Sequence, residues 1–225
     1  MFCSKCGKTL EDAAAFCSAC GAKVSGPANN DDGEKLDKYL KLAFAAVNAA
    51  NRADALQYAN KALEIAPEEH QGWVAKAKAT AWGSTLNQNE VPAATGAAKN
   101  AVIFAPDELK TQVADDCYLT IKNIVAQLLN LAQSMPMAMV PAQLNTFTHV
   151  HTIMTQWIQL VSEIPDLSPA LVAGEVQECQ TLCKQSKSAI MPGKRKIYAA
   201  SVAARIKDGY GEEMRRALWN KGIQV

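Results

Sequence analysis

Four of the seven cysteines stand as two pairs near the start of the chain, Cys3 with Cys6 and Cys17 with Cys20. Each pair has two residues between its cysteines, and a glycine follows the second cysteine. A Cys-x-x-Cys turn directs two thiolates at one ion, and a following glycine lets backbone N–H groups turn toward the sulfurs. Two such turns supply the closed tetrahedral set of a structural zinc site. The spacing therefore predicts one structural Zn²⁺ with no open position for catalysis.

Folding of residues 1–24 is expected to depend on that ion. The segment has few large apolar side chains, Phe2, Leu10, Phe16 and Val24, which are too few to form a self-sufficient core. Zinc binding by such peptides contributes roughly 10–16 kcal/mol, which offsets the deficit. The alternatives are two disulfides, a redox dithiol, or iron in place of zinc. A reducing compartment, the matched second pair and the lack of an electron-transfer context favour zinc.

The same residues carry a resemblance to a known family. Met-Phe-Cys-Ser-Lys-Cys-Gly at 1–7 and Phe-Cys-Ser-Ala-Cys-Gly at 16–21 resemble the short N-terminal zinc ribbons of bacterial and archaeal proteins. The resemblance implies two zinc knuckles on a small β-hairpin framework, with the four cysteines as ligands. It covers about a tenth of the chain. Such ribbons precede many unrelated domains, so the resemblance indicates a site and does not indicate a function.

Composition divides the rest of the chain into three parts. Residues 25–34 are polar and rich in turn formers, which is typical of a flexible linker. Residues 35–190 have apolar side chains at spacings of three and four, the period of an amphipathic helix. Residues 191–225 hold eight Lys or Arg and three Asp or Glu, in a chain of net charge +1. The sequence predicts a mainly α protein, with a small zinc ribbon joined by the linker to an all-α helical array.

Prolines, glycines and apolar periodicity predict about eight helices. We expect them at about 36–47, 55–65, 68–83, 91–105, 107–133, 142–163 and 168–190, with a final basic helix from about Lys194 that is interrupted at Gly209 and Gly211. The β-branched run 146–153 is where a strand competes. We favour a helix there because no partner strand is in sight.

Two stretches of the predicted array repeat, Ala-Leu-Glu-Ile-Ala-Pro at 62–67 and Ala-Val-Ile-Phe-Ala-Pro at 101–106. Residues 36–106 resemble tetratricopeptide repeats. The matching positions are Tyr39, Leu42, Ala43, Ala46, Ala55, Ala59, Ala62 and Pro67 in the first unit, and Trp73, Ala77, Ala94, Ala98, Ala101 and Pro106 in the second. The second unit departs from the pattern, because Pro106 follows Pro67 by 39 residues and the repeat has about 34.

The tetratricopeptide resemblance implies a concave face that binds a peptide or a partner helix. The residues that it places on this face are Leu40, Phe44, Val47, Asn48, Val74, Lys78 and Trp82. Leu40 and Phe44 occupy places where some members clamp a carboxylate, so that variant of the function is in doubt. The alternative is that later helices of the same chain cover these residues, since at least three helical pairs are usually needed for stability.

Other cysteines and histidines allow a weaker metal hypothesis. Cys179 and Cys183 are four residues apart on a predicted helix and could form a second site with His149 or His151. The interpretation that we favour is two small buried thiols in a helix seam. Cys117, which stands alone, is expected in the core.

The C-terminal segment forms a predicted basic patch. Its members are Lys194, Arg195, Lys196, Arg205, Lys207, Arg215 and Arg216. Such a segment could contact an anionic membrane, nucleic-acid phosphates or an acidic partner. We favour a last helix that caps the array and has its charged side in water.

No motif of a nucleophilic triad, phosphate loop, dinucleotide site or His-Glu zinc site is visible. The sequence also lacks a signal-peptide pattern and any apolar run of transmembrane length, so a cytoplasmic location is expected. We expect a non-catalytic adaptor or assembly factor whose helical surface binds a protein or peptide, with the ribbon as a second contact. The alternative is a nucleic-acid-associated regulator that uses the ribbon and the basic C-terminal helix. A small-molecule substrate is not expected.

Overall fold

Helices make up most of the described chain, which comprises residues 8–9, 19–20, 30–134, 140–188 and 210–224 of a computed structural model. The elements are α1 (Asn30–Asn48), α2 (Arg52–Ile65), α3 (His70–Ala81), α4 (Val91–Phe104), the 3₁₀ helix η1 (Asp107–Leu109), α5 (Lys110–Ser134), α6 (Val140–Glu163), α7 (Pro169–Val172), α8 (Glu175–Ser188) and α10 (Tyr210–Trp219). The prediction of a mainly α protein is confirmed for these residues. No helix among them is long and apolar enough to cross a membrane.

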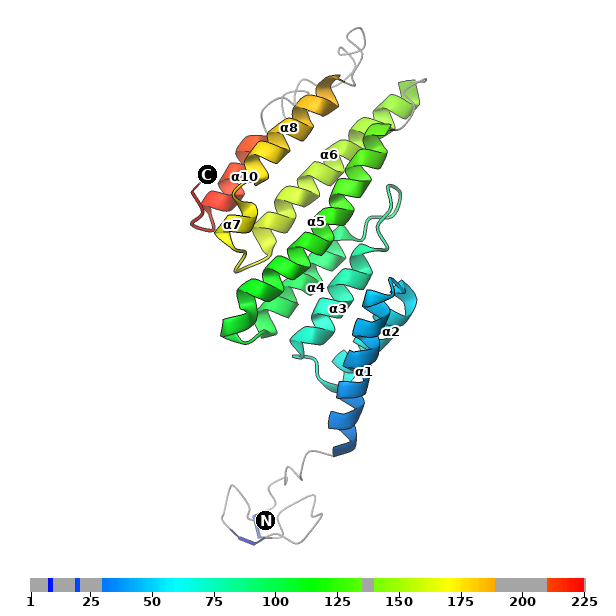
Figure 1. The fold of residues 1–225 in the computed structure, drawn as a ribbon, viewed down its shortest axis with the longest axis vertical. Helices are drawn as coiled ribbons and strands as arrows, with labels where there is room; N and C mark the ends of the chain where they lie inside the picture. Colours follow the sequence, from blue (N-terminus) through cyan, green and yellow to red (C-terminus); the bar gives the residue numbers. More distant parts are fainter. Residues whose placement is uncertain (1–7, 10–18, 21–29, 135–139, 189–209, 225) are drawn as a thin grey trace.

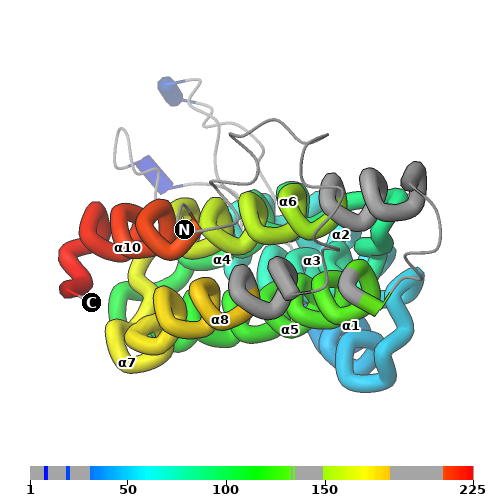
Figure 2. Tube along the Cα trace, turned by 90° about the horizontal axis from the view of Figure 1, so that it is seen from above, coloured from blue at the N-terminus to red at the C-terminus, as the bar shows by residue number. Residues whose placement is uncertain are grey.

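The helices pair as hairpins that lie side by side (Figure 1). α1 packs on α2, α3 on α4, α5 on α6, and α8 on α10. Neighbouring hairpins are joined because α1 contacts α3, α3 contacts α5, α4 contacts α6, and α6 contacts α10. Figure 2 shows α1, α5 and α8 along one side, with α6 and α10 along the other. We call the row α1, α3, α5 and α8 the first layer, and the row α2, α4, α6 and α10 the second layer.

Local hydrogen bonds begin and end the first hairpins. Asn51 caps α2, where its side chain accepts a hydrogen bond from the backbone N–H of Asp54 at 3.3 Å. α2 ends at Ile65, two residues before Pro67, as the proline predicts. Trp73 of α3 donates its indole N–H to the Pro67 carbonyl at 2.7 Å. This bond ties the α2–α3 connection to the helix that follows.

Small side chains fill the seam between α1, α2 and α3. The buried cluster there consists of Ala43, Ala46, Val47, Ala55, Ala59, Ala75 and Ala79. Small residues at a crossing let helix axes approach closely, which is what the spacing of the alanines predicts. Leu56, Tyr58 and Trp82 pack against the edge of this cluster.

Replacing Ala75 by leucine is expected to destabilise the fold by about 1–3 kcal/mol. Ala75 is fully buried in the seam, so the added carbons have no space without moving a helix. Urea unfolding followed by circular dichroism measures the change. The matched control is Ala93→Leu on the exposed side of α4, which is expected to stay within about 0.5 kcal/mol. Equal effects at the two positions would show that the seam is loosely packed.

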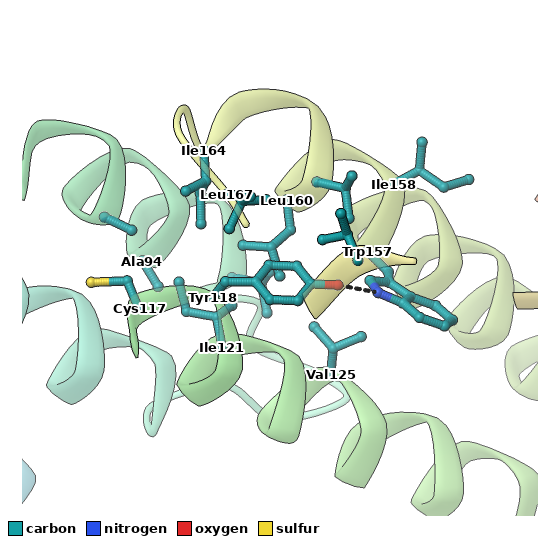
Figure 3. Close-up of a cluster of buried hydrophobic side chains, with 14 of the residues drawn as sticks. Ala94, Cys117, Tyr118, Ile121, Val125, Trp157, Ile158, Leu160, Ile164 and Leu167 are labelled. Carbon is teal, nitrogen blue, oxygen red and sulfur yellow. Dashed lines mark hydrogen bonds between the residues drawn. The ribbon is translucent and has the colours of Figure 1, made fainter. Parts of the chain in front are cut away.

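A larger core joins α3 to α10. Tyr118 of α5 and Trp157 of α6 are buried in it, and the indole N–H of Trp157 donates to the Tyr118 hydroxyl at 3.2 Å (Figure 3). The bond satisfies a polar group that would otherwise be costly to bury. Val176 of α8 and Met214 of α10 belong to the same core. The later hairpins therefore pack against the earlier ones, as the need for at least three helical pairs predicts.

The start of α1 differs from the predicted boundary. α1 begins at Asn30, so residues 30–34 of the expected linker are helical. Asp31 and Asp32 lie in the first turn, where carboxylates stabilise the positive end of the helix dipole. Asp31 also pairs with Lys35 one turn later. These local charges extend the helix into a segment whose composition resembles a linker.

Two later boundaries also differ from prediction. The expected helix at 168–190 is divided, because α7 ends at Val172 and α8 begins after Gly174. Gly211 does not interrupt the last helix but lies buried in the first turn of α10. A Cβ there would come within 2.7 Å of Gln180 Cγ, so the glycine allows α10 to approach α8. The β-branched run 146–153 is helical, within α6, as we favoured.

Candidate interaction surface and metal site

Of the four predicted zinc ligands, the structure describes Cys20, which is exposed. Cys3, Cys6 and Cys17 lie outside the described residues. The donor set fits zinc, since four cysteine sulfurs in two Cys-x-x-Cys turns match the ligands of closed structural sites. No group of three or more possible metal ligands occurs in the part of the chain that the structure describes.

The seven residues predicted for a concave face separate into core and surface. Val47 and Val74 are buried, with exposed fractions of 8% and 5%, so they belong to the core and offer no contact to a partner. This correction arises because neighbouring helices cover these sides of α1 and α3. Leu40, Phe44 and Trp82 are half-buried, and Asn48 is exposed. The alternative interpretation, cover by later helices, holds for Val74, which lies in the core shared with α5 and α6, whereas Val47 lies in the seam of α1, α2 and α3.

Lys78 of α3 reaches across to α5. Its ammonium group lies 2.8 Å from the Asp116 carboxylate, and the Lys78 side chain is mostly covered. Trp82, the C-cap of α3, packs instead against the seam of α1, α2 and α3. The ion pair between Lys78 and Asp116 therefore marks the place where α3 and α5 meet at the surface of the first layer.

A polar stripe runs along α5 from that ion pair. Gln112, Asp116, Leu119, Asn123 and Gln127 follow one another at spacings of three or four residues, and all five are exposed. We call the combined surface the α3–α5 face, which consists of Lys78, Gln112, Asp116, Leu119, Asn123 and Gln127. Sequence reasoning missed its α5 members. The signal was there, because the same spacing places them opposite the apolar side of the predicted helix at 107–133.

Leu119 is the apolar member of the α5 stripe. Its side chain is 44% exposed, whereas the adjacent Tyr118 is fully buried. Its stripe neighbours Gln112, Asn123 and Gln127 are uncharged and can both donate and accept hydrogen bonds. Leu119 thus gives the α3–α5 face an exposed apolar group beside side chains that form hydrogen bonds.

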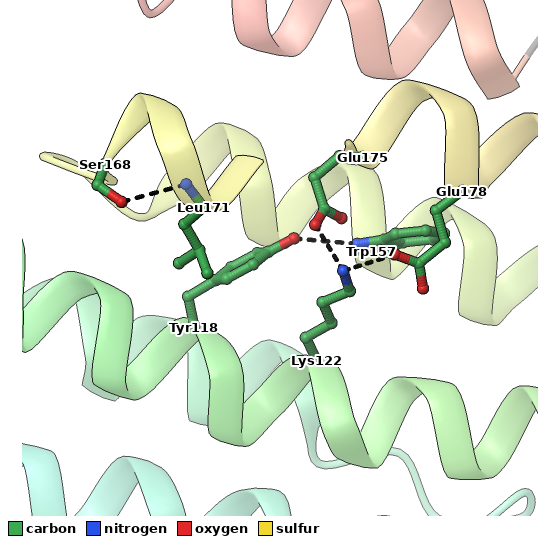
Figure 4. A network of polar contacts seen from close by, with 7 residues as sticks. All are labelled: Tyr118, Lys122, Trp157, Ser168, Leu171, Glu175 and Glu178. Carbon is green, nitrogen blue, oxygen red and sulfur yellow. Dashed lines mark hydrogen bonds and ion pairs between the residues drawn. The ribbon is translucent and has the colours of Figure 1, made fainter. Parts of the chain in front are cut away.

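A polar network connects α5 to α6 and α8. The Lys122 ammonium lies 2.5 Å from Glu175 and 2.8 Å from Glu178, and 5.3 Å from the centre of the Trp157 ring (Figure 4). Burial, and then the charge of Glu175, raise the pKa of the Tyr118 hydroxyl above its usual value. No hydrogen bond among the described residues reaches the buried Oε2 atom of Glu175. Lys122 is thus the counter-charge that this carboxylate requires.

The alternative metal site depends on Cys183, and no group of three or more possible ligands occurs among the other cysteines and histidines that the structure describes. Cys117 and Cys179 are fully buried, as expected for core thiols. Burial raises the pKa of Cys117 to about 12, so the thiol stays protonated and unreactive. His151 of α6 contacts the hydroxyl of Tyr210 in α10 through its Nδ1 atom. The side chain of Cys183 lies outside the described residues, and His149 is half-buried.

The predicted basic patch is described at two of its seven members. Arg215 and Arg216 lie on α10, and Arg215 pairs with Glu212 one turn earlier. The other five members, Lys194, Arg195, Lys196, Arg205 and Lys207, lie outside the described residues. The expectation of a last helix that caps the array agrees with α10, because its buried side packs against α6 and α8.

Comparison with known proteins identifies the N-terminal segment. Residues 2–24 match the family model of a zinc-ribbon domain, which implies zinc binding by this segment. The match ends before α1 begins, so the resemblance of residues 36–106 to tetratricopeptide repeats stays a prediction. No curated protein and no solved structure matches the chain. The family match therefore supports the predicted zinc ribbon at residues 2–24 and does not extend to the helical array.

Proposed function

We propose that this chain is a non-catalytic adaptor in which the helical array binds a protein or peptide and the zinc ribbon supplies a second contact. The observation that carries the proposal is the half-exposed Leu119 among uncharged polar side chains on the α3–α5 face. An apolar group surrounded by adaptable hydrogen-bonding groups is the usual make-up of a protein interface.

The α3–α5 face suits an extended peptide. Amide side chains such as Asn123 and Gln127 can donate to a peptide carbonyl and accept from a peptide N–H. Leu119 offers an apolar contact three residues from Asp116 of the Lys78–Asp116 pair. Because that pair is already matched in charge, the face favours a largely uncharged segment over a strongly acidic or basic one.

The stacked hairpins of residues 36–106 act as tetratricopeptide-like repeats, and the α5–α6 hairpin extends the surface that they present. We place the protein in the cytoplasm of a bacterium or archaeon, where thiolates remain reduced and available to zinc. No step of bond making or breaking is assigned to it.

Replacing Leu119 by arginine is expected to weaken partner binding at least about tenfold, because an unpaired guanidinium would be buried at the centre of the contact. The partner is first captured from native lysate with nuclease present and identified by mass spectrometry. Titration calorimetry with the purified partner then measures the affinity. The control is Ile103→Arg, since Ile103 is 52% exposed on α4 in the second layer.

Loss of binding in the Leu119 variant with retention in the Ile103 variant supports the α3–α5 face. Equal retention in both variants, or capture that disappears on nuclease treatment, would overturn the proposal.

A further inference from the structure

α10 is anchored by its buried side. Tyr210, Met214 and Leu218 are fully buried, and the helix packs between α6 and α8. The side chain of Lys221, just after the helix, donates to the backbone carbonyl of Ile164 at the end of α6. The helix is therefore held rigidly, and its opposite side faces solvent.

The outward side of α10 carries an unusual combination of residues. Trp219 is 64% exposed, the largest value among the exposed large hydrophobic side chains in the described part of the chain. Arg216 and Arg215 precede it by three and four residues, which places all three side chains on neighbouring positions of one helix face. Arg215 pairs with Glu212, whereas Arg216 pairs with no carboxylate in the described residues.

We propose that this outward face of α10 binds single-stranded nucleic acid, with an unstacked base on the Trp219 indole and backbone phosphates on Arg216 and Arg215. An exposed aromatic ring beside guanidinium groups is the arrangement that recognises single strands without regard to sequence. Charge complementarity supports a polyanion, because Arg215 and Arg216 flank the exposed ring and Arg216 has no carboxylate partner among the described residues. The surface is separate from the α3–α5 face, so the inference does not depend on the proposed function.

A membrane surface fits this helix less well. Amphipathic helices bind membranes by inserting an apolar side, and the apolar side of α10 is already buried in the core. Only Trp219 would be left to insert. A single-stranded polyanion uses the residues that are exposed and leaves the packing of Tyr210 and Met214 intact.

The test is fluorescence anisotropy of a labelled oligothymidylate of about 16 nucleotides with the full zinc-loaded chain. Trp219→Ala is expected to weaken binding about five- to a hundredfold, and Trp219→Phe to retain most of it, because phenylalanine still stacks. The double variant Arg215→Gln/Arg216→Gln is expected to lower the slope of a plot of log affinity against log salt concentration by about one to two in magnitude.

Controls make each outcome decisive. Lys38→Gln/Lys99→Gln removes the same charge from exposed positions on α1 and α4, and is expected to leave the affinity for the oligonucleotide close to that of the unaltered chain. Affinity unchanged in the Trp219→Ala variant, or equal affinity for a duplex of the same length, would overturn the proposal. So would binding to vesicles of anionic lipid that depends on Trp219 and is stronger than binding to the oligonucleotide.

Discussion

The double variant Cys17→Ser/Cys20→Ser is expected to lose its zinc entirely. Serine hydroxyls do not replace thiolates, and the remaining Cys3 and Cys6 supply half of a tetrahedral set. Zinc binding contributes roughly 10–16 kcal/mol to the folding of such segments, so residues 1–24 are expected to unfold with the loss of the ion. Elemental analysis after dialysis measures the zinc content of the variant and of the unaltered chain.

The helical array should be unaffected by the same change. The two buried clusters draw on residues from Ala43 onward, so the described core does not use the ribbon. The thermal midpoint by far-UV circular dichroism is therefore expected to match that of the unaltered chain. Ser18→Ala, in the same segment, is the control and should retain one zinc per chain. A lower midpoint in the cysteine variant would show that the ribbon is part of the helical core, and retained zinc would show that other ligands bind it.

Features set by local sequence were predictable. The ends of α2 and α4 follow from Pro67 and Pro106, because proline cannot continue a helix. The alanine seam follows from the spacing of small residues on helices that must cross. The zinc-ribbon match at residues 2–24 follows from a motif whose four cysteines lie within 18 residues of one another. In each case the physical cause is a short pattern of residue types that can be recognised in the sequence.

The α3–α5 face could not be predicted as a unit, because it depends on how the hairpins stack. Lys78 and Asp116 are 38 residues apart, and nothing in either helix specifies the other as its partner. The same stacking explains the burial of Val74, which lies on a helix with neighbours on several sides. A repeat pattern assigns such a residue to a surface, whereas its burial depends on which hairpins follow.

The last hairpin shows the same limit more sharply. Glu175 at the start of α8 has the sequence signature of a solvated helix terminus, where a carboxylate is favourable. In the structure its side chain is buried, because α8 lies against α5 at Lys122, 53 residues earlier in the chain. The burial of the Glu175 side chain is thus a result of tertiary packing and is not specified by the sequence of α8.

Replacing Lys122 by methionine is expected to destabilise the protein by about 3 kcal/mol, because it leaves the buried Glu175 carboxylate without its counter-charge. Adding Glu175→Gln to the same chain should recover most of this loss, since no unpaired charge then remains buried. Urea unfolding of the single and double variants measures both values. The matched control is Lys76→Met, because Lys76 lies 5.1 Å from the centre of the Trp73 ring and its loss should cost no more than about 1 kcal/mol.

The ionisation of Lys122 gives this pair a defined pH dependence. Burial lowers the pKa of Lys122, but hydrogen bonds to Glu175 and Glu178 outweigh it and hold the pKa above its usual 10.5. A pKa raised in the folded state means that the charged lysine stabilises the fold, so its contribution is fully present at neutral pH and is lost as the pH rises above about 10.5. The Lys122→Met variant should lack this alkaline decline. Equal destabilisation of the single and double variants, with the decline retained, would show instead that the Lys122–Glu175 pair does not stabilise the fold.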